Sequence, residues 1–315
     1  MQILVGDKKH GCTRGRLPCL GDVATVNVTR GCAGACLYCY ARCYSGTPAA
    51  GSLLIYPNLP ALLRHELDSA RRRRALPPFV LFCSAGDPFL GGPEVLELSR
   101  ACLELLLRRE IGVSLTTRGV VPDEVLALLT RHRQRVRIAV ALASTDDGYT
   151  RRWEPGTAAP QQRLLLLQRL LAADLAPQVH IEPLIPFVND GSEPLRELLS
   201  SLAGLGIRRA MLSLLQLRPG VADQLAREAP HELQRLILGC FPTWQQPGRH
   251  AEYDHLAPRQ ALGLVQRVQR LAQEHGIALT VCHCHNPGLP GGRCDLTPAA
   301  ATSPPAAQGD LFPPP

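Results

Sequence analysis

Short apolar runs and amphipathic helical patterns alternate along most of this 315-residue chain, and this alternation limits the fold more than any other feature. Repeated strand–helix units favour a parallel sheet with helical crossovers. The strand-like runs are rich in Val, Ile and Leu, as in strands buried on both faces. We predict an α/β fold, a complete or partial barrel, with its chemistry at the carboxyl ends of the strands. The predicted strands are 23–28, 79–83, 113–117, 136–142, 179–185, 209–215 and 277–281; the predicted helices are 59–73, 93–109, 122–131, 161–173, 193–205 and 259–274, with a less regular helical stretch before Gly239.

Both ends of the chain differ from this alternating region. From Thr297 onward the composition changes to Pro, Ala and Ser, which bury too little apolar surface to order a segment. We predict an N-terminal extension (1–20), the barrel (21–285), and a Cys/Pro-rich C-terminal extension with a disordered tail (286–315).

Composition and charge exclude some classes of protein. No window approaches the ~18 uncharged apolar residues of a membrane-spanning helix, and the N-terminus lacks the apolar core of a secretory signal. We therefore expect a cytoplasmic protein without a membrane partner. Twelve cysteines then indicate metal ligation or redox chemistry, because the cytosol keeps thiols reduced. The net charge of +7 is compatible with a polyanionic partner.

Three of the cysteines form a compact motif after the first predicted strand. Cys32, Cys36 and Cys39 have the spacing C-x3-C-x2-C. Three thiolates at this spacing can hold one face of a [4Fe–4S] cluster and leave the fourth iron open to a small molecule. A zinc loop is the alternative for the same donors.

This motif, with Tyr38 before its last cysteine, resembles that of the radical S-adenosylmethionine superfamily. Tyr40 after it is similar to the spore photoproduct lyase-like (DNA repair photolyase-like) branch. The resemblance implies a partial (β/α) barrel, a [4Fe–4S] cluster, and S-adenosylmethionine chelated to the open iron. It also implies reductive cleavage to a 5′-deoxyadenosyl radical, which abstracts hydrogen from a substrate. Further segments follow in family order over roughly residues 20 to 285: 84–88, 116–118, 143–146, 154–157 with Arg163, and 183–186 with 189–190.

The resemblance assigns roles to single residues. Cys32, Cys36 and Cys39 match the cluster ligands. The other assignments are Tyr38 beside the adenine, Ser84 and Asp87 at the methionine ammonium, Arg118 at the carboxylate, Ser144 at the ribose, Cys83 as hydrogen donor and Tyr40 in hydrogen relay. Simpler explanations exist, because Ser and Asp often cap helices and a cysteine closing a buried strand is most often a core residue.

The terminal segments carry a second set of potential metal ligands. If the two ends meet, a second iron–sulfur cluster or a zinc site is one explanation, and free thiols are the other. The residues are Cys12, Cys19, Cys282, Cys284 and Cys294, with His283 and His285 among them.

Two features favour a nucleic-acid substrate. Arg71–Arg74 and the arginines at 131, 133, 135 and 137 could contact phosphates, although charge runs are usually solvated helix faces. Gln308–Phe312 resembles the peptide by which repair proteins bind the sliding clamp.

We expect a radical enzyme that repairs a DNA lesion, with a reductant such as flavodoxin or ferredoxin as partner. The alternatives are a radical enzyme that modifies a peptide or small metabolite with a second cluster, and a non-catalytic iron–sulfur redox sensor. The sequence leaves open the substrate, the electron donor, the oligomeric state and whether S-adenosylmethionine is regenerated.

Overall fold

The computed structural model describes residues 1–315 except 18–19, 70–75, 243–253, 285, 294–295 and 300–315. Several sequence predictions therefore concern positions outside the described residues: Arg71–Arg74, Cys19, His285, Cys294 and the clamp-like segment Gln308–Phe312.

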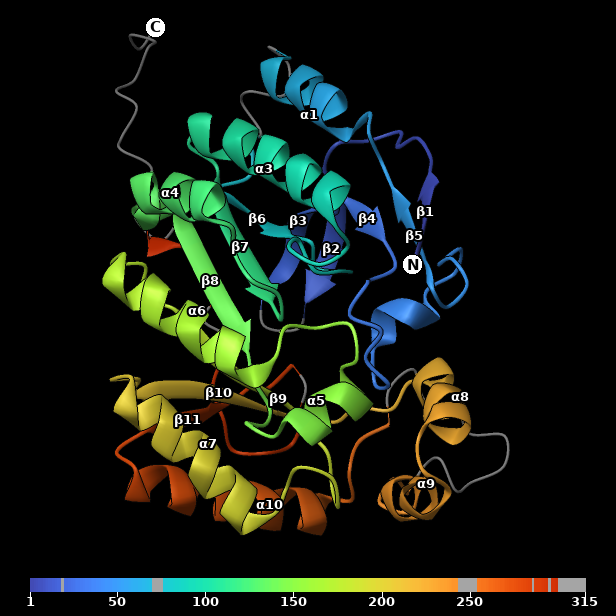
Figure 1. The fold of residues 1–315 in the computed structure, drawn as a ribbon, viewed down its shortest axis with the longest axis vertical. Coiled ribbons are helices and arrows are strands. Elements are labelled where there is room, and N and C mark those ends of the chain that lie inside the picture. The colour runs from blue at the N-terminus through green and yellow to red at the C-terminus, as the bar shows by residue number, and fades with distance from the viewer. Residues whose placement is uncertain (18–19, 70–75, 243–253, 285, 294–295, 300–315) are drawn as a thin grey trace, which may run out of the picture.

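An eight-stranded sheet forms the centre of the molecule, in the order β11-β10-β9-β8-β7-β6-β3-β2 (Figure 1). All neighbouring pairs from β3 to β11 are parallel, whereas β2 pairs with β3 antiparallel. The order is linear, so the described strands form an open, partial barrel, which confirms the predicted α/β class. The bounds are β2 Thr13–Leu17, β3 Gly21–Val26, β6 Phe79–Phe82, β7 Gly112–Thr117, β8 Val136–Ala141, β9 Gln178–Leu184, β10 Arg209–Leu214 and β11 Ala278–Val281.

Helices cover the outer face of this curved sheet (Figure 1). Each presents an apolar stripe at helical spacing, as Val95, Cys102 and Leu106 do in α3, where all three are buried. The helices are α1 Leu59–Asp68, α3 Pro93–Arg108, α4 Asp123–Arg131, α5 Asp147–Trp153, α6 Pro160–Ala172, α7 Ser192–Gly204, α8 Pro219–Glu228, α9 His231–Leu238 and α10 Pro258–Glu274, with 3-10 turns η1 Tyr40–Cys43 and η2 Arg133–Arg135.

The two faces of the sheet differ in chemistry. The strand register places apolar residues together on the face that joins the core with the helices: Val80, Phe82, Val113, Leu115, Ile138, Val140, Val179, Ile181, Leu212 and Val281. The residues between them face the bore of the barrel and are mostly small or polar: Ser114, Thr116, Ala139, Ala141, Gln178 and His180. The central strands are buried on both faces, as predicted, because inward-facing residues such as Ser114, Ala141 and His180 are buried as well as the residues that face the helices.

The N-terminal residues contain more structure than the sequence suggested. Besides β2 in the main sheet, β1 (Gln2–Val5), β5 (Ser52–Ile55) and β4 (Thr29–Arg30) form a three-stranded sheet in the order β1-β5-β4. The division at residue 20 stays a prediction, but β2 joins the segment before it to the barrel by hydrogen bonds to β3. Near the other end, Pro298 is buried and lies against Gly112 at the start of β7.

The basic residues around η2 lie at the amino end of β8, whereas Arg118 follows the carboxyl end of the neighbouring strand β7 and the cysteine loop follows β4. Arg133 and Arg135 form ion pairs there with Asp174 and Glu110. Phosphate contacts of these arginines stay a prediction. Among the helices described, none is sufficiently long and apolar to cross a bilayer.

Candidate active site

The cysteine loop, residues 31–39, is held from two sides by segments distant in sequence. From the α5–α6 side, the Leu37 N–H donates to the Trp153 carbonyl at 3.0 Å, and the Gly156 N–H donates to the Gly34 carbonyl at 3.0 Å. From α8, the Gln224 side-chain amide donates to the Leu37 carbonyl at 2.6 Å. Because these backbone groups are fixed, the loop is ordered by the protein itself.

The chemistry of the three thiols fits a cluster. Burial, and then the neighbouring Cys39, raise the pKa of Cys32; burial, and then Glu154, raise the pKa of Cys36. Such thiols bind as thiolates only if a strong cation compensates for the buried charge, which cluster irons would do. Across the part of the chain that the structure describes, no three Cys, His, Asp or Glu side chains converge on a single metal ion.

Arg118, directly after β7, supplies a cationic group that fits the carboxylate of S-adenosylmethionine. Its Nη2 donates to the Glu182 carbonyl at 2.9 Å, and its guanidinium lies 5.8 Å from the centre of the Tyr38 ring. Its buried Nε has no hydrogen-bond partner within the described residues. A buried guanidinium N–H without an acceptor favours an anionic ligand at that point.

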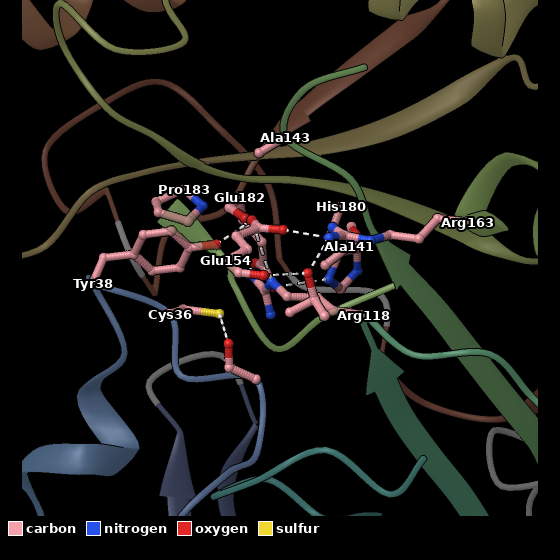
Figure 2. A network of polar contacts seen from close by, with 12 residues as sticks. Cys36, Tyr38, Arg118, Ala141, Ala143, Glu154, Arg163, His180, Glu182 and Pro183 are labelled. Atoms are coloured by element: carbon pink, nitrogen blue, oxygen red, sulfur yellow. Dashed lines mark hydrogen bonds and ion pairs between the residues drawn. The ribbon is translucent and has the colours of Figure 1, made fainter. Parts of the chain in front are cut away.

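A buried network surrounds Arg118 beside Cys36, and Figure 2 shows its side chains converging from several loops. Glu154, after α5, accepts a hydrogen bond from the Tyr38 hydroxyl. Its Oε2 lies 2.6 Å from Nη2 of Arg163, and both side chains are 1% exposed. Its Oε1 lies 3.7 Å from Nε of Arg118. Tyr38, predicted to lie by the adenine, is thus fixed through its hydroxyl by a carboxylate.

The other predicted cofactor residues lie at the same end of the barrel, in different environments. The Asp87 carboxylate is buried and accepts from the Thr117 hydroxyl and from the backbone N–H groups of Phe89 and Arg118. These bonds favour a structural role for Asp87, and its contact with an ammonium stays a prediction. Ser84 is exposed at the mouth. Ser144 is buried, and its hydroxyl accepts from the Asp146 N–H at 3.1 Å.

The two residues predicted to be catalytic are placed differently. Cys83 is 4% exposed, has φ +56°, and belongs to the hydrophobic core. Burial raises its pKa, with Val28, Asp87, Cys102 and Lys8 as its electrostatic neighbours. This location gives the hydrogen-donor role no support, and the role stays a prediction from the resemblance.

Tyr40, in contrast, lies at the mouth of the barrel. Its hydroxyl donates to the Ser84 carbonyl at 2.7 Å, and its ring meets Tyr44 edge-on at 5.7 Å between centroids. The Arg218 guanidinium lies over both rings, at 5.0 and 5.6 Å. Tyr40 therefore joins the cysteine loop to the loop after β6, in an aromatic and cationic group.

Below the network, the bore contains a His–Glu pair that the sequence analysis did not identify. Nδ1 of His180 lies 3.6 Å from the Glu182 carboxylate, and Figure 2 shows both residues beside the network around Arg118. His180 is 2% exposed, yet its Nε2 has no hydrogen-bond partner within the described residues. Ser213 Oγ and Gln178 Oε1 are likewise buried without a hydrogen-bond partner within the described residues.

The described terminal cysteines lie far apart in the sheet. Cys12 precedes β2, and its N–H donates to Glu66 of α1 at 3.0 Å. Cys282 follows β11, at the opposite end of the strand order, with Cys284 close by in sequence. Cys19 and Cys294 lie outside the described residues. The structure therefore gives no support to a shared site of Cys12 with Cys282 and Cys284.

We predict that Gln224→Leu weakens cluster retention. Gln224 is 3% exposed and donates to the Leu37 carbonyl at 2.6 Å, so its loss removes this donor from a buried acceptor at a cost of about 1–3 kcal/mol, while Arg42 still donates to the Cys36 carbonyl. The measurement is the rate of iron release to a chelator. Gln234→Leu is the matched control, because Gln234 makes the same type of bond to Ala229, away from the loop. Equal release rates in the two variants would contradict the prediction.

Several residues of this site were missed for a physical reason. Glu154 and Arg163 occur in segments that support the resemblance, but no local pattern shows that they form a buried pair. Gln224 contacts Leu37 across 187 positions of sequence. The alternation in β9 could have placed His180 and Glu182 on one face, but not in the bore.

This chain is similar in sequence to a known protein family and to an uncharacterized protein. Residues 26–202 match the family model described as the radical SAM superfamily. An uncharacterized protein of Mycobacterium tuberculosis is 30% identical over 291 residues, which cover 88% of this chain and 81% of that protein.

Two solved structures have a similar fold. Spore photoproduct lyase complexed with dinucleoside spore photoproduct has a TM-score of 0.64 at 16% identity, over 89% of this chain and 82% of that one. A radical SAM methyltransferase from Sphaerobacter thermophilus has a TM-score of 0.50 at 17% identity, over 87% of this chain and 77% of that one.

Proposed function

Because this chain belongs to the radical SAM superfamily and is one of its enzymes, we propose that it uses Cys32, Cys36 and Cys39 to hold the [4Fe–4S] cluster and acts on a DNA lesion. The observation that carries the catalytic part is the position of the fixed cysteine loop beside the buried, unsatisfied Nε of Arg118. When bound, the cluster and S-adenosylmethionine supply a 5′-deoxyadenosyl radical that abstracts hydrogen from the substrate.

The side chains of this protein then have distinct tasks. In this proposal Arg118 binds the carboxylate of S-adenosylmethionine through its unsatisfied Nε, and the buried Ser144 binds the ribose. Tyr38, held through its hydroxyl by Glu154, contributes an apolar wall beside the adenine. The buried surroundings of this group exclude water, which protects a reactive radical from side reactions.

The mouth of the barrel supports a nucleic-acid substrate. Tyr40, Tyr44 and Arg218 combine aromatic rings with a guanidinium, and bases stack on such groups without strong sequence preference. Arg151 and Arg152 of α5 are exposed at the same end and add positive charge. A lesion must leave the base stack to enter the bore, at a cost of a few kcal/mol, and stacking on these rings would offset part of it.

The polar residues of the bore also support the proposed substrate, because a radical enzyme must orient the substrate atom from which hydrogen is abstracted. The unsatisfied groups of His180 and Ser213 can bond the polar edge of a base. The peptide or metabolite alternative depends on a second cluster, which the iron analysis below tests.

We predict about four irons and four sulfides per chain after anaerobic reconstitution, because one triplet of thiolates holds one cluster. Iron and sulfide analysis of the purified holoprotein measures this. A content near eight irons would contradict a single cluster and would restore the terminal cysteines as ligands.

The experiment for the substrate uses a dinucleoside spore photoproduct and an unirradiated dinucleoside as its matched control. We expect the holoenzyme, dithionite and S-adenosylmethionine to convert the photoproduct and leave the control unchanged, as measured by mass spectrometry. Release of 5′-deoxyadenosine without loss of the photoproduct would reject this lesion as the substrate, while leaving the radical chemistry intact.

A further inference from the structure

Two arginines approach one buried carboxylate at the candidate active site, and only one of them pairs with it closely. Nη2 of Arg163 lies 2.6 Å from Oε2 of Glu154, whereas Nε of Arg118 lies 3.7 Å from Oε1. Oε1 already accepts a hydrogen bond from the Tyr38 hydroxyl. Oε1 therefore has the Tyr38 hydroxyl as its hydrogen-bond partner, and Oε2, which accepts no hydrogen bond within the described residues, has the Arg163 guanidinium as its ion-pair partner.

Arg163 is anchored independently of the carboxylate. Its Nε donates to the Ala158 carbonyl at 2.8 Å and its Nη1 to the Ala141 carbonyl at 3.0 Å. Its Nη2 also donates to the Thr157 hydroxyl at 2.5 Å. Since these acceptors fix the guanidinium between α6 and the end of β8, the cation stays at Glu154 whether or not a ligand is bound.

Arg118 is held with its Nε unused. Its Nη2 donates to the Glu182 carbonyl, and its own carbonyl accepts from the Ala158 N–H at 2.9 Å. A small rotation would bring the guanidinium to Glu154, because only about 1 Å separates the present 3.7 Å from a charged hydrogen bond. In a buried site that attraction is strong unless another cation satisfies the carboxylate.

We propose that Arg163 is a positioning residue that occupies Glu154 and thereby keeps the Arg118 guanidinium available for the carboxylate of S-adenosylmethionine. The inference rests on the proposed role of Arg118 in binding that cofactor, and it goes beyond that role because it predicts competition between an internal and an external carboxylate. The pair Glu154–Arg163 then sets cofactor affinity without touching the cofactor.

The test compares dissociation constants for S-adenosylmethionine, measured from the change that it causes in the electron paramagnetic resonance spectrum of the reduced cluster. This readout records binding and requires no substrate. Arg118→Met should bind roughly 10-fold or more weakly, because it loses a charged hydrogen bond. Arg163→Met should weaken binding by a similar factor of roughly 10, because Glu154 then captures Arg118.

The decisive variants remove the competing carboxylate. Glu154→Gln still accepts the Tyr38 hydroxyl but has no charge, so its affinity should equal or exceed that of the wild type. The double variant Arg163→Met/Glu154→Gln should return to within about threefold of the wild type. It buries no lone charge, so it remains informative if Arg163→Met fails to fold. Arg169→Met, on the same helix and paired with exposed Asp123, is the matched control and should change nothing.

The opposing results are specific. A purely structural pair would make Glu154→Gln and the double variant bind as weakly as Arg163→Met, and this outcome would overturn the inference. Wild-type affinity in Arg163→Met, with weak binding in Arg118→Met, would overturn the inference but keep the proposed role of Arg118. Wild-type affinity in Arg118→Met would overturn both. Circular dichroism and iron content establish that each variant is folded and loaded.

Discussion

Replacement of Cys36 by Ala is expected to abolish release of 5′-deoxyadenosine and to prevent the cluster from loading. Cys36 is 6% exposed, and its charged neighbours include Glu154 and the other two thiols, so water has little access to take its place as a ligand. Two remaining thiolates do not hold a cluster with one open iron. The measurements are iron content, visible absorbance and 5′-deoxyadenosine after reduction with dithionite.

Cys102→Ala is the control for this experiment. Cys102 is 0% exposed, on the inner stripe of α3, so the variant loses core packing at a cost of about 1–2 kcal/mol but no proposed ligand. It should load the cluster and release 5′-deoxyadenosine as the wild type does. If Cys36→Ala were as active as Cys102→Ala, the assignment of the cysteine loop would be wrong.

The second large effect is expected from a single methyl group at Gly156. A Cβ at this position would lie 2.0 Å from the Ala33 carbonyl oxygen and 3.0 Å from the Gly34 carbonyl carbon. Both obstacles are backbone, so Gly156→Ala must displace one of the two loops. We expect a loss of about 3 kcal/mol of stability, a melting temperature lower by roughly 5–10 °C, and reduced iron content.

Gly263→Ala provides the matched substitution. Gly263 lies inside α10, and a Cβ there meets no atom within 4 Å. Because alanine favours a helix more than glycine does, this variant should gain up to about 1 kcal/mol. Thermal melting and iron analysis of both variants make the comparison. A Gly156→Ala protein that melts and loads as the wild type does would show that the two loops are not in contact.

Sequence periodicity predicted the central strands well, because the alternation of side chains along each strand can be read from a few consecutive residues. Phe79–Phe82 and Val136–Ala141 alternate between the helical core and the bore, and their predicted bounds differ by one residue from those observed. The same reasoning missed Gln2–Val5 and Thr13–Leu17, which are largely exposed. These strands exist because a neighbouring strand supplies hydrogen bonds, and a hydrophobic pattern does not report such pairing.

The residues of the candidate site also fall into those that a local motif predicts and those that only tertiary contacts bring together. The cysteine triplet is a local motif, and its chemistry follows from the spacing of three thiols in one loop. Glu154 meets Tyr38 across 116 residues, and this contact depends on how α5 ends beside the loop. Tertiary pairs of this kind have no periodic signature. For Asp87, the structure adds what the motif omits, namely the donors that already occupy its carboxylate.

The supports of the cysteine loop have a consequence for the order of events during synthesis. The three thiols leave the ribosome early, whereas the groups that hold their backbone, at 153–156 and at Gln224, are translated more than a hundred residues later. A nascent chain that ends before α8 contains every ligand but lacks the amide that bonds Leu37. Iron–sulfur delivery to this protein should therefore be post-translational, or should at least await emergence of the last third of the chain.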